Sequence, residues 1–141
     1  MSILVQKREK VTVENTPCEW KAYKNGVSFE LYGAAHPLYQ FAMARFYGIV
    51  SSQDILELDE HSLTGEAQLA IFAKYLVKDW KGVEGENNEK LEVTPDNFLS
   101  LIETDPEVWD FVNEKVIEIQ NDFNKKVEAT KKKQSRVSSG K

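Results

Sequence analysis

Residues 94–123, TPDNFLSLIETDPEVWDFVNEKVIEIQNDF, contain two helix starts and one long apolar seam. Thr94 before Pro95 has the form of an N-cap followed by proline at the first helical position, where the missing N–H costs nothing. Asp105 before Pro106 repeats the pattern, and the residue before a proline disfavours the α conformation, so the first helix must end there. The stretch therefore predicts a short helix, a sharp corner and a long final helix.

The final helix carries an apolar seam whose spacing alternates between three and four residues. A seam of this kind packs either into the protein's own core or against a helix of a partner. Core packing is the ordinary expectation for so short a seam, and the sequence leaves both alternatives open. The seam consists of Trp109, Val112, Val116, Ile119 and Phe123.

Two more helices are predicted upstream of this stretch. Residues 37–50 repeat apolar side chains at helical spacing, and residues 64–80 do so around much of their circumference, which indicates a central and buried helix. Thr64 is the candidate N-cap of the second helix, and Trp80 is its last apolar residue. Residues 82–93 are rich in glycine, asparagine and charge, which predicts a loop whose ends can pair as an exposed hairpin.

The N-terminal third is typical of β-strands. Residues 10–14 alternate between polar and apolar side chains, as a half-buried strand does. Asn25-Gly26 supplies the two positive φ angles of a type I′ turn between two runs rich in aromatic and branched residues, which predicts a hairpin. The apolar face of its second strand, which helices are expected to cover, consists of Val27, Phe29 and Leu31.

Together these patterns predict a mainly α (α+β) protein with one domain over residues 1–124. A small N-terminal β-hairpin unit is expected over residues 1–33, and a compact bundle of about four helices over residues 36–124. Beyond Asn124 the chain has too little apolar area to offset the entropy of ordering, which predicts a fraying helix end and a flexible basic tail over residues 125–141.

Charge is unevenly distributed along the chain. The net charge is −5, yet residues 125–141 contain seven basic residues against one acid, Glu128, and so carry +6. Residues 1–124 are left with −11, and an acidic body of this kind repels polyphosphate, which argues against nucleic-acid binding by the folded part. The basic residues of the tail include Lys125, Lys126, Lys131, Lys132, Lys133 and Arg136.

No pattern of residues predicts catalysis, a metal site or a cofactor. Cys18 is the only cysteine, which excludes a disulfide within the chain, and His36 and His61 belong to no metal-binding signature. His61 follows an acidic stretch with Glu57 and Asp59 whose spacing does not match a calcium loop, so a solvated acidic turn is expected. We therefore expect a protein that is not an enzyme, with no catalytic residues, no metal and no cofactor.

The N-terminus gives no sign of export. Residues 1–10 contain only a three-residue apolar run, which is too short for a signal peptide. Nowhere do 18 apolar residues follow one another, so no membrane partner is expected either. The expected location is the cytosol.

From residue 64 onward, a helix ends in a Val-x-Asp-Trp-x-Gly-Val segment and is followed by a turn, a Thr-Pro-x-Asn helix start, an Asp-Pro-Glu step and a long helix with a late Phe. This order resembles the tail assembly chaperones of long-tailed, siphovirus-like bacteriophages and prophages. Upstream, YKNGVSFELYGAAHPLYQFAMAR resembles that family's hairpin leading into a helix, so the likeness spans residues 20–124. The matching positions are Val77, Asp79, Trp80, Gly82, Val83, Thr94, Pro95, Asn97, Leu99, Leu101, Asp105, Pro106, Glu107 and Phe123.

The resemblance implies a small, mainly helical protein of the host bacterial cytoplasm that is absent from the mature virion. Such proteins bind the long tape-measure protein and keep it soluble while tail-tube subunits gather around it. Many families also make a longer form by a programmed frameshift, and that form recruits the tail-tube protein. An A-rich slip site that encodes residues 131–133 would be a suitable place for such a shift, and self-association is a further possibility.

A chaperone of this kind needs an apolar surface for an amphipathic helix of its partner. The candidate partner-binding residues are Phe41 and Tyr47 in the helix over 37–50, and Val112, Val116, Ile119 and Phe123 in the final seam. The alternative for each residue is simple core packing. An alternative function is a small adapter or regulator that docks through its basic tail on an acidic partner or nucleic acid, and Trp20 is a further candidate for an exposed anchor.

Overall fold

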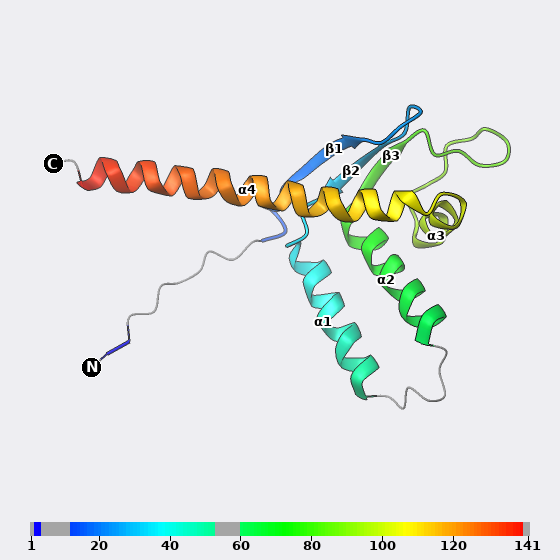
Figure 1. Cartoon of the computed structure of the whole chain (residues 1–141), viewed down its shortest axis with the longest axis horizontal. Helices are drawn as coiled ribbons and strands as arrows, with labels where there is room; N and C mark the ends of the chain where they lie inside the picture. Colours follow the sequence, from blue (N-terminus) through cyan, green and yellow to red (C-terminus); the bar gives the residue numbers. More distant parts are fainter. Residues whose placement is uncertain (1, 4–11, 53–59, 140–141) are drawn as a thin grey trace.

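The computed structural model describes residues 2–3, 12–52 and 60–139. Three strands form one antiparallel sheet in the order β1-β2-β3, and four helices complete the described fold. The prediction of a compact α+β fold with four helices is confirmed (Figure 1). The elements are β1 (Cys18–Ala22), β2 (Ser28–Tyr32), α1 (Pro37–Ser52), α2 (Glu60–Leu76), β3 (Val77–Lys81), α3 (Pro95–Thr104) and α4 (Glu107–Ser139).

The β1–β2 hairpin forms where the sequence predicts it. Asn25 has a φ of 55° and Gly26 a φ of 79°, the positive values that a type I′ turn requires. The N–H of Val27 donates to the carbonyl of Lys24 at 3.0 Å and closes the turn. On the strand that follows, Phe29 is fully buried, as the alternation of the sequence indicates.

The third strand differs from the prediction. Residues 77–81 were expected to end the second helix, but α2 stops at Leu76 and the chain continues as β3 beside β2. Trp80 pairs with Phe29 across the two strands, and its indole N–H donates to the carbonyl of Leu91 at 2.8 Å. The four-residue spacing from Leu76 to Trp80 suits a helix equally well, so periodicity alone could not separate the two structures. α2 also begins at Glu60, before the predicted N-cap.

The core lies between the sheet and the helices. α4 crosses one face of the sheet and contacts β2 and β1, while α2 contacts β3, β2 and α3 (Figure 1). An aromatic cluster joins α2, α3 and α4, in which the ring of Phe72 stacks on Phe98 at 5.8 Å and meets the edge of Trp109 at 5.0 Å. The fully buried large side chains are Trp80, Phe29, Phe72, Phe98, Leu31, Leu76, Ile119, Val108 and Val112.

The corner between α3 and α4 matches its sequence signals. The hydroxyl of Thr94 accepts a hydrogen bond from the N–H of Asn97 at 3.1 Å, which is the predicted N-cap of α3. One carboxylate oxygen of Asp105 accepts from the N–H of Glu107 at 3.2 Å, and the other accepts from the hydroxyl of Tyr23 at 2.9 Å. Asp105 therefore starts α4 and ties it to the hairpin.

Three other segments complete the comparison with the sequence. Residues 12–16 form a hydrogen-bonded turn instead of the predicted strand, because the Thr12 hydroxyl accepts from the N–H of Asn15 at 3.3 Å, while residues 10–11 lie outside the described part. The loop over 82–93 does pair its ends, through a bridge between Glu84 and Lys90. Glu57, Asp59 and the rest of 53–59 lie outside the described residues.

The basic C-terminal segment continues as helix. The sequence predicts a fraying end that passes into a flexible tail, whereas α4 extends over 33 residues to Ser139. Residues 125–139 project beyond the sheet and the other helices, at the end of the molecule opposite α3 (Figure 1). We call residues 125–139 the α4 extension.

Candidate partner-binding surface

The start of α1 is fastened to α4 by the loop over residues 33–36. The N–H of Ala34 donates to the carbonyl of Val116 at 3.0 Å, and the N–H of Ala35 donates to Oε1 of Gln120 at 3.1 Å. Gln120 is buried, so this hydrogen bond is shielded from water. Gly33 allows the close approach, because a Cβ at that position would lie 2.5 Å from Oε1 of Gln120.

His36 precedes α1 directly and caps its first turn. Its Nδ1 accepts a hydrogen bond from the N–H of Leu38 at 3.2 Å, and its ring meets the edge of Tyr32 at 5.0 Å. Burial lowers the pKa of His36 below its ordinary value. The lowered pKa favours the neutral imidazole, in which Nδ1 can accept this hydrogen bond when it carries no proton.

α1 is covered on one side only. Among the described elements its main contacts are with α2, and α1 and α2 together extend from the sheet as a pair of antiparallel helices (Figure 1). The covered side carries Tyr39, whose ring meets Phe72 edge-on at 6.1 Å. Ala42, Met43 and Phe46 on the same side are half-buried. We call α1 and α2 together the arm.

The rest of the α1 surface is open to solvent and carries apolar side chains. Phe41 is 68% exposed, Tyr47 is 54% exposed and Leu38 is 48% exposed. The Tyr47 hydroxyl accepts a hydrogen bond from the side chain of Gln68 on α2 at 3.1 Å, which holds the ring beside the neighbouring helix. The α1 face, as we define it, consists of Leu38, Phe41, Ala44, Arg45, Tyr47 and Gly48, all exposed.

An exposed surface of this composition differs from an ordinary helix surface. Arg45 is the only charged residue of α1, although 29% of all residues in the chain are charged. Single exposed apolar side chains are common on soluble proteins, but several that adjoin on one helix mark an interaction site. Sequence analysis selected Phe41 and Tyr47 as candidates for binding a partner. It missed Leu38, because the sequence alone does not distinguish Leu38 from the apolar residues of α1 that face α2.

The seam of α4 lies mostly in the core. Val112, Val116 and Ile119 are all buried, because the apolar face of β2 packs against them. Phe123 is half-buried. Val112, Val116 and Ile119 therefore pack in the protein's own core, which is the first of the two alternatives for this seam, and they line no open groove.

The α4 extension carries the basic residues away from the body. Lys125 and Lys126 are exposed, and the backbone at residues 131–136, with Lys131, Lys132, Lys133 and Arg136, continues the same helix. The described side chains of the extension include only one half-buried apolar residue, Val127. A helix with so little apolar contact offers charge and length instead of a packed surface.

The described part of the chain contains no group of three or more His, Cys, Asp or Glu side chains that could hold a metal ion. The Cys18 thiol is half-buried, and its burial together with the carboxylate of Glu30 raises the pKa of the thiol, so it is a poor nucleophile. Trp20, predicted to be exposed, is 39% exposed with the ammonium of Lys81 at 4.4 Å from its ring centroid.

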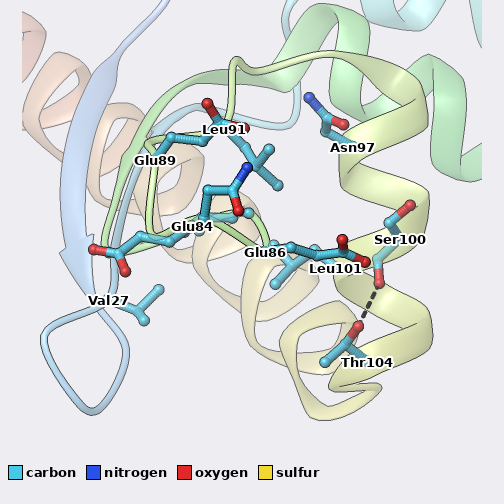
Figure 2. A pocket seen from close by; sticks show the side chains of 13 residues that line it. Val27, Glu84, Glu86, Glu89, Leu91, Asn97, Ser100, Leu101 and Thr104 are labelled. Atoms are coloured by element: carbon cyan, nitrogen blue, oxygen red, sulfur yellow. Dashed lines mark hydrogen bonds between the residues drawn. The ribbon is translucent and has the colours of Figure 1, made fainter.

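One open hollow of about 650 Å³ lies between the 82–91 loop and α3. Figure 2 shows carboxylates at its rim and a hydrogen bond from the hydroxyl of Thr104 to the carbonyl of Ser100, which measures 2.8 Å. The acidic side chains of the hollow come from the 82–91 loop and do not converge on one point in the view of Figure 2. They are Glu84, Glu86 and Glu89.

Comparison with known proteins places the chain among phage-derived proteins. A family model described as YdaY prophage protein matches residues 34–133, from the loop before α1 into the α4 extension. No curated protein and no solved structure matches the chain significantly. None of the described helices is long and apolar enough to cross a membrane.

Proposed function

The chain belongs to the YdaY prophage protein family, and from this premise we propose that it is a non-enzymatic tail assembly chaperone that binds a tape-measure protein through the α1 face. The observation that carries the proposal is the apolar α1 face, with Phe41 and Tyr47 open to solvent. The matched region contains this helix entirely. The protein acts in the cytoplasm of the host bacterium and is absent from the finished virion.

The partner's chemistry explains the need for such a surface. A tape-measure chain is expected to be long and helical with apolar stripes, and an exposed stripe aggregates unless it is covered. A helix that offers its own apolar side can cover a stripe by helix-to-helix packing. α1 suits this role because α2 is its main neighbour among the described elements.

The charge of the body supports the same function. Residues 1–124 carry −11, so complexes coated by several copies repel one another and stay dispersed.

Tail-tube subunits are recruited by an extended frameshift product, whose slip site lies in the codons of residues 131–133. Reading the gene across these codons tests this part, and the lack of a heptameric slip sequence would remove it.

The first prediction tests the α1 face. Coexpression with the tape-measure protein of the same prophage is expected to keep that protein in the soluble fraction, and the double substitution Phe41→Ser with Tyr47→Ser is expected to abolish this effect. Both side chains are exposed, so the free energy of unfolding should change by no more than about 0.5 kcal/mol per site. The soluble fraction is measured by centrifugation, and stability by urea denaturation.

A matched control is available on α4. Ile117 is 53% exposed and lies outside the arm, so Ile117→Ser removes a similar apolar surface without touching the α1 face. This control is expected to keep the tape-measure protein soluble. Equal loss of activity in the control and the double variant would contradict a specific role for α1.

A second candidate function rests on the α4 extension. Its exposed Lys125 and Lys126 point to an adapter or regulator that docks on an acidic partner or nucleic acid. Docking of that kind weakens steeply as salt concentration rises. Apolar capture by α1 lacks this strong dependence, so the salt profile of partner binding discriminates the two functions.

A further inference from the structure

Arg45 is the one charge on the apolar α1 face. It lies four residues after Phe41 and one residue after Ala44, so these side chains share the exposed side of the helix. None of the ion pairs between described residues includes Arg45. Arg45 is therefore an exposed charge beside apolar groups, and no carboxylate of the described residues forms an ion pair with it.

The surroundings of Arg45 allow close approach of another helix. Ala44 and Gly48 are both small and exposed, and a Cβ added to Gly48 would meet no atom within 4 Å. Small side chains bring two helix axes nearer, toward the lower end of the usual range of about 8–10 Å. A helix seated there covers part of the Arg45 stem, which is itself apolar.

Covering Arg45 has an electrostatic consequence. A guanidinium that loses water on one side needs a hydrogen-bonding anion, or the complex carries an uncompensated charge. The planar fork of arginine matches a carboxylate with two parallel hydrogen bonds. A lysine of the partner opposite Arg45 would repel the guanidinium. Arg45 therefore selects among apolar helices by the charge that they carry at this point.

We propose that the segment captured by the α1 face is an amphipathic helix that places a carboxylate opposite Arg45, beside the apolar stripe that lies on Phe41. This inference rests on the proposed function and adds the charge sign that the partner stripe must carry. The carboxylate sets the register of the two helices, since apolar contacts alone allow sliding. The net charge of −11 over residues 1–124 favours basic partners in general, so selection of an acidic stripe by Arg45 is a local exception.

The test uses two synthetic helical peptides that share one apolar stripe and differ only at a central position on its border, which is Glu in one peptide and Lys in the other. The full-length protein is expected to bind the Glu peptide at least about fivefold more tightly, as measured by fluorescence titration. The variant Arg45→Glu is expected to reverse the preference. Lys74→Glu makes the same charge change at an exposed position of α2 that is not one of the residues of the α1 face, and should leave the preference as in the wild type.

The inference is overturned if neither peptide binds, if the Lys peptide binds as well as the Glu peptide, or if Lys74→Glu reverses the preference as Arg45→Glu does. Coexpression with the tape-measure protein separates this result from the proposed function. A preference for the Glu peptide with an insoluble tape-measure protein would refute the chaperone role alone. A soluble tape-measure protein with no peptide preference would refute the role of Arg45 alone.

Discussion

At the scale of single residues, the fastening between the 33–36 loop and α4 carries the first structural prediction. Gly33→Ala places a methyl group 2.5 Å from Oε1 of Gln120 and 2.9 Å from Cγ of Pro17, so the buried amide must move and its hydrogen bond to Ala35 is lost. The expected loss is about 1–3 kcal/mol in the free energy of unfolding, measured by urea denaturation.

The same substitution at Gly48 is the matched control. Gly48 lies in α1, and a Cβ there meets no atom within 4 Å. Alanine is favoured over glycine inside a helix, so Gly48→Ala is expected to leave stability unchanged or raise it by up to about 1 kcal/mol. Effects of the same sign and size at the two glycines would contradict the close packing of Gly33 on Gln120.

The lowered pKa of His36 predicts how the free energy of unfolding depends on pH. Burial lowers the pKa of His36 in the folded protein, so the unfolded chain binds a proton more readily. The free energy of unfolding should therefore fall as pH decreases through the ordinary histidine pKa of about 6.5 toward the lowered folded value. Protonation also removes the acceptor that caps α1 through Leu38.

His36→Asn tests this dependence, because an asparagine oxygen can accept from the same N–H without titrating. The slope of stability between about pH 7 and pH 5.5 should flatten in this variant, whatever its absolute stability. A flat wild-type profile, or a slope that persists unchanged in His36→Asn, would refute the assignment.

At the scale of the helices and strands, features that depend on near neighbours in the sequence were predicted correctly. The pairing of strands from distant parts of the chain was not. The cap at Thr94 and the turn at Asn25 depend on near neighbours in the chain, and both have the predicted geometry. Residues 77–81 depend on a distant strand, because Phe29 is the cross-strand neighbour of Trp80. A helical spacing of apolar residues is indistinguishable from a strand until that neighbour is known.

The α3 cap makes a prediction at this scale. Thr94→Ala removes the oxygen that accepts from the N–H of Asn97, and should destabilise the protein by about 1 kcal/mol. Thr94→Ser keeps the acceptor and should remain close to wild type. Thr104→Ala removes a hydroxyl that donates only to the Ser100 carbonyl on an exposed surface, and a change of less than about 0.5 kcal/mol is expected by thermal denaturation.

Only part of the candidate site could be predicted, because the sequence does not show which apolar helix faces the rest of the protein covers. Phe41 and Tyr47 were selected as apolar residues of a helix, and they are exposed because no described element other than α2 packs extensively on α1. Val112 and Val116 were selected by the same criterion and lie against the sheet. Periodicity finds an apolar face, but only the tertiary arrangement decides whether the protein's own chain covers it.

At the scale of the whole molecule, the body and the α4 extension are separable. Deleting residues 125–141 leaves Asn124, whose side chain accepts a hydrogen bond from Gln120 at 3.0 Å, and leaves all of the buried seam in place. We expect the shortened protein to fold and to keep the tape-measure protein soluble, measured by coexpression and centrifugation. An adapter that docks through its basic tail would lose partner binding.

A full-length variant with Lys131, Lys132 and Lys133 replaced by Gln controls for length. It removes charge from the extension and retains the chain. Solubilisation should again persist, and any binding that rises at low salt in the wild type should weaken in this variant. Loss of tape-measure solubility in both variants would favour the adapter and refute the division of roles between α1 and the extension.

The straight course of α4 also decides where a second polypeptide can be attached. A helix rises about 1.5 Å per residue, so the α4 extension adds roughly 20 Å of helix beyond Asn124. The arm leaves the sheet in a different direction (Figure 1). The α4 extension would therefore act as a helical spacer for a label or domain fused after Ser139 and keep it away from Phe41 and Tyr47. One molecule could then bind two different proteins without steric conflict.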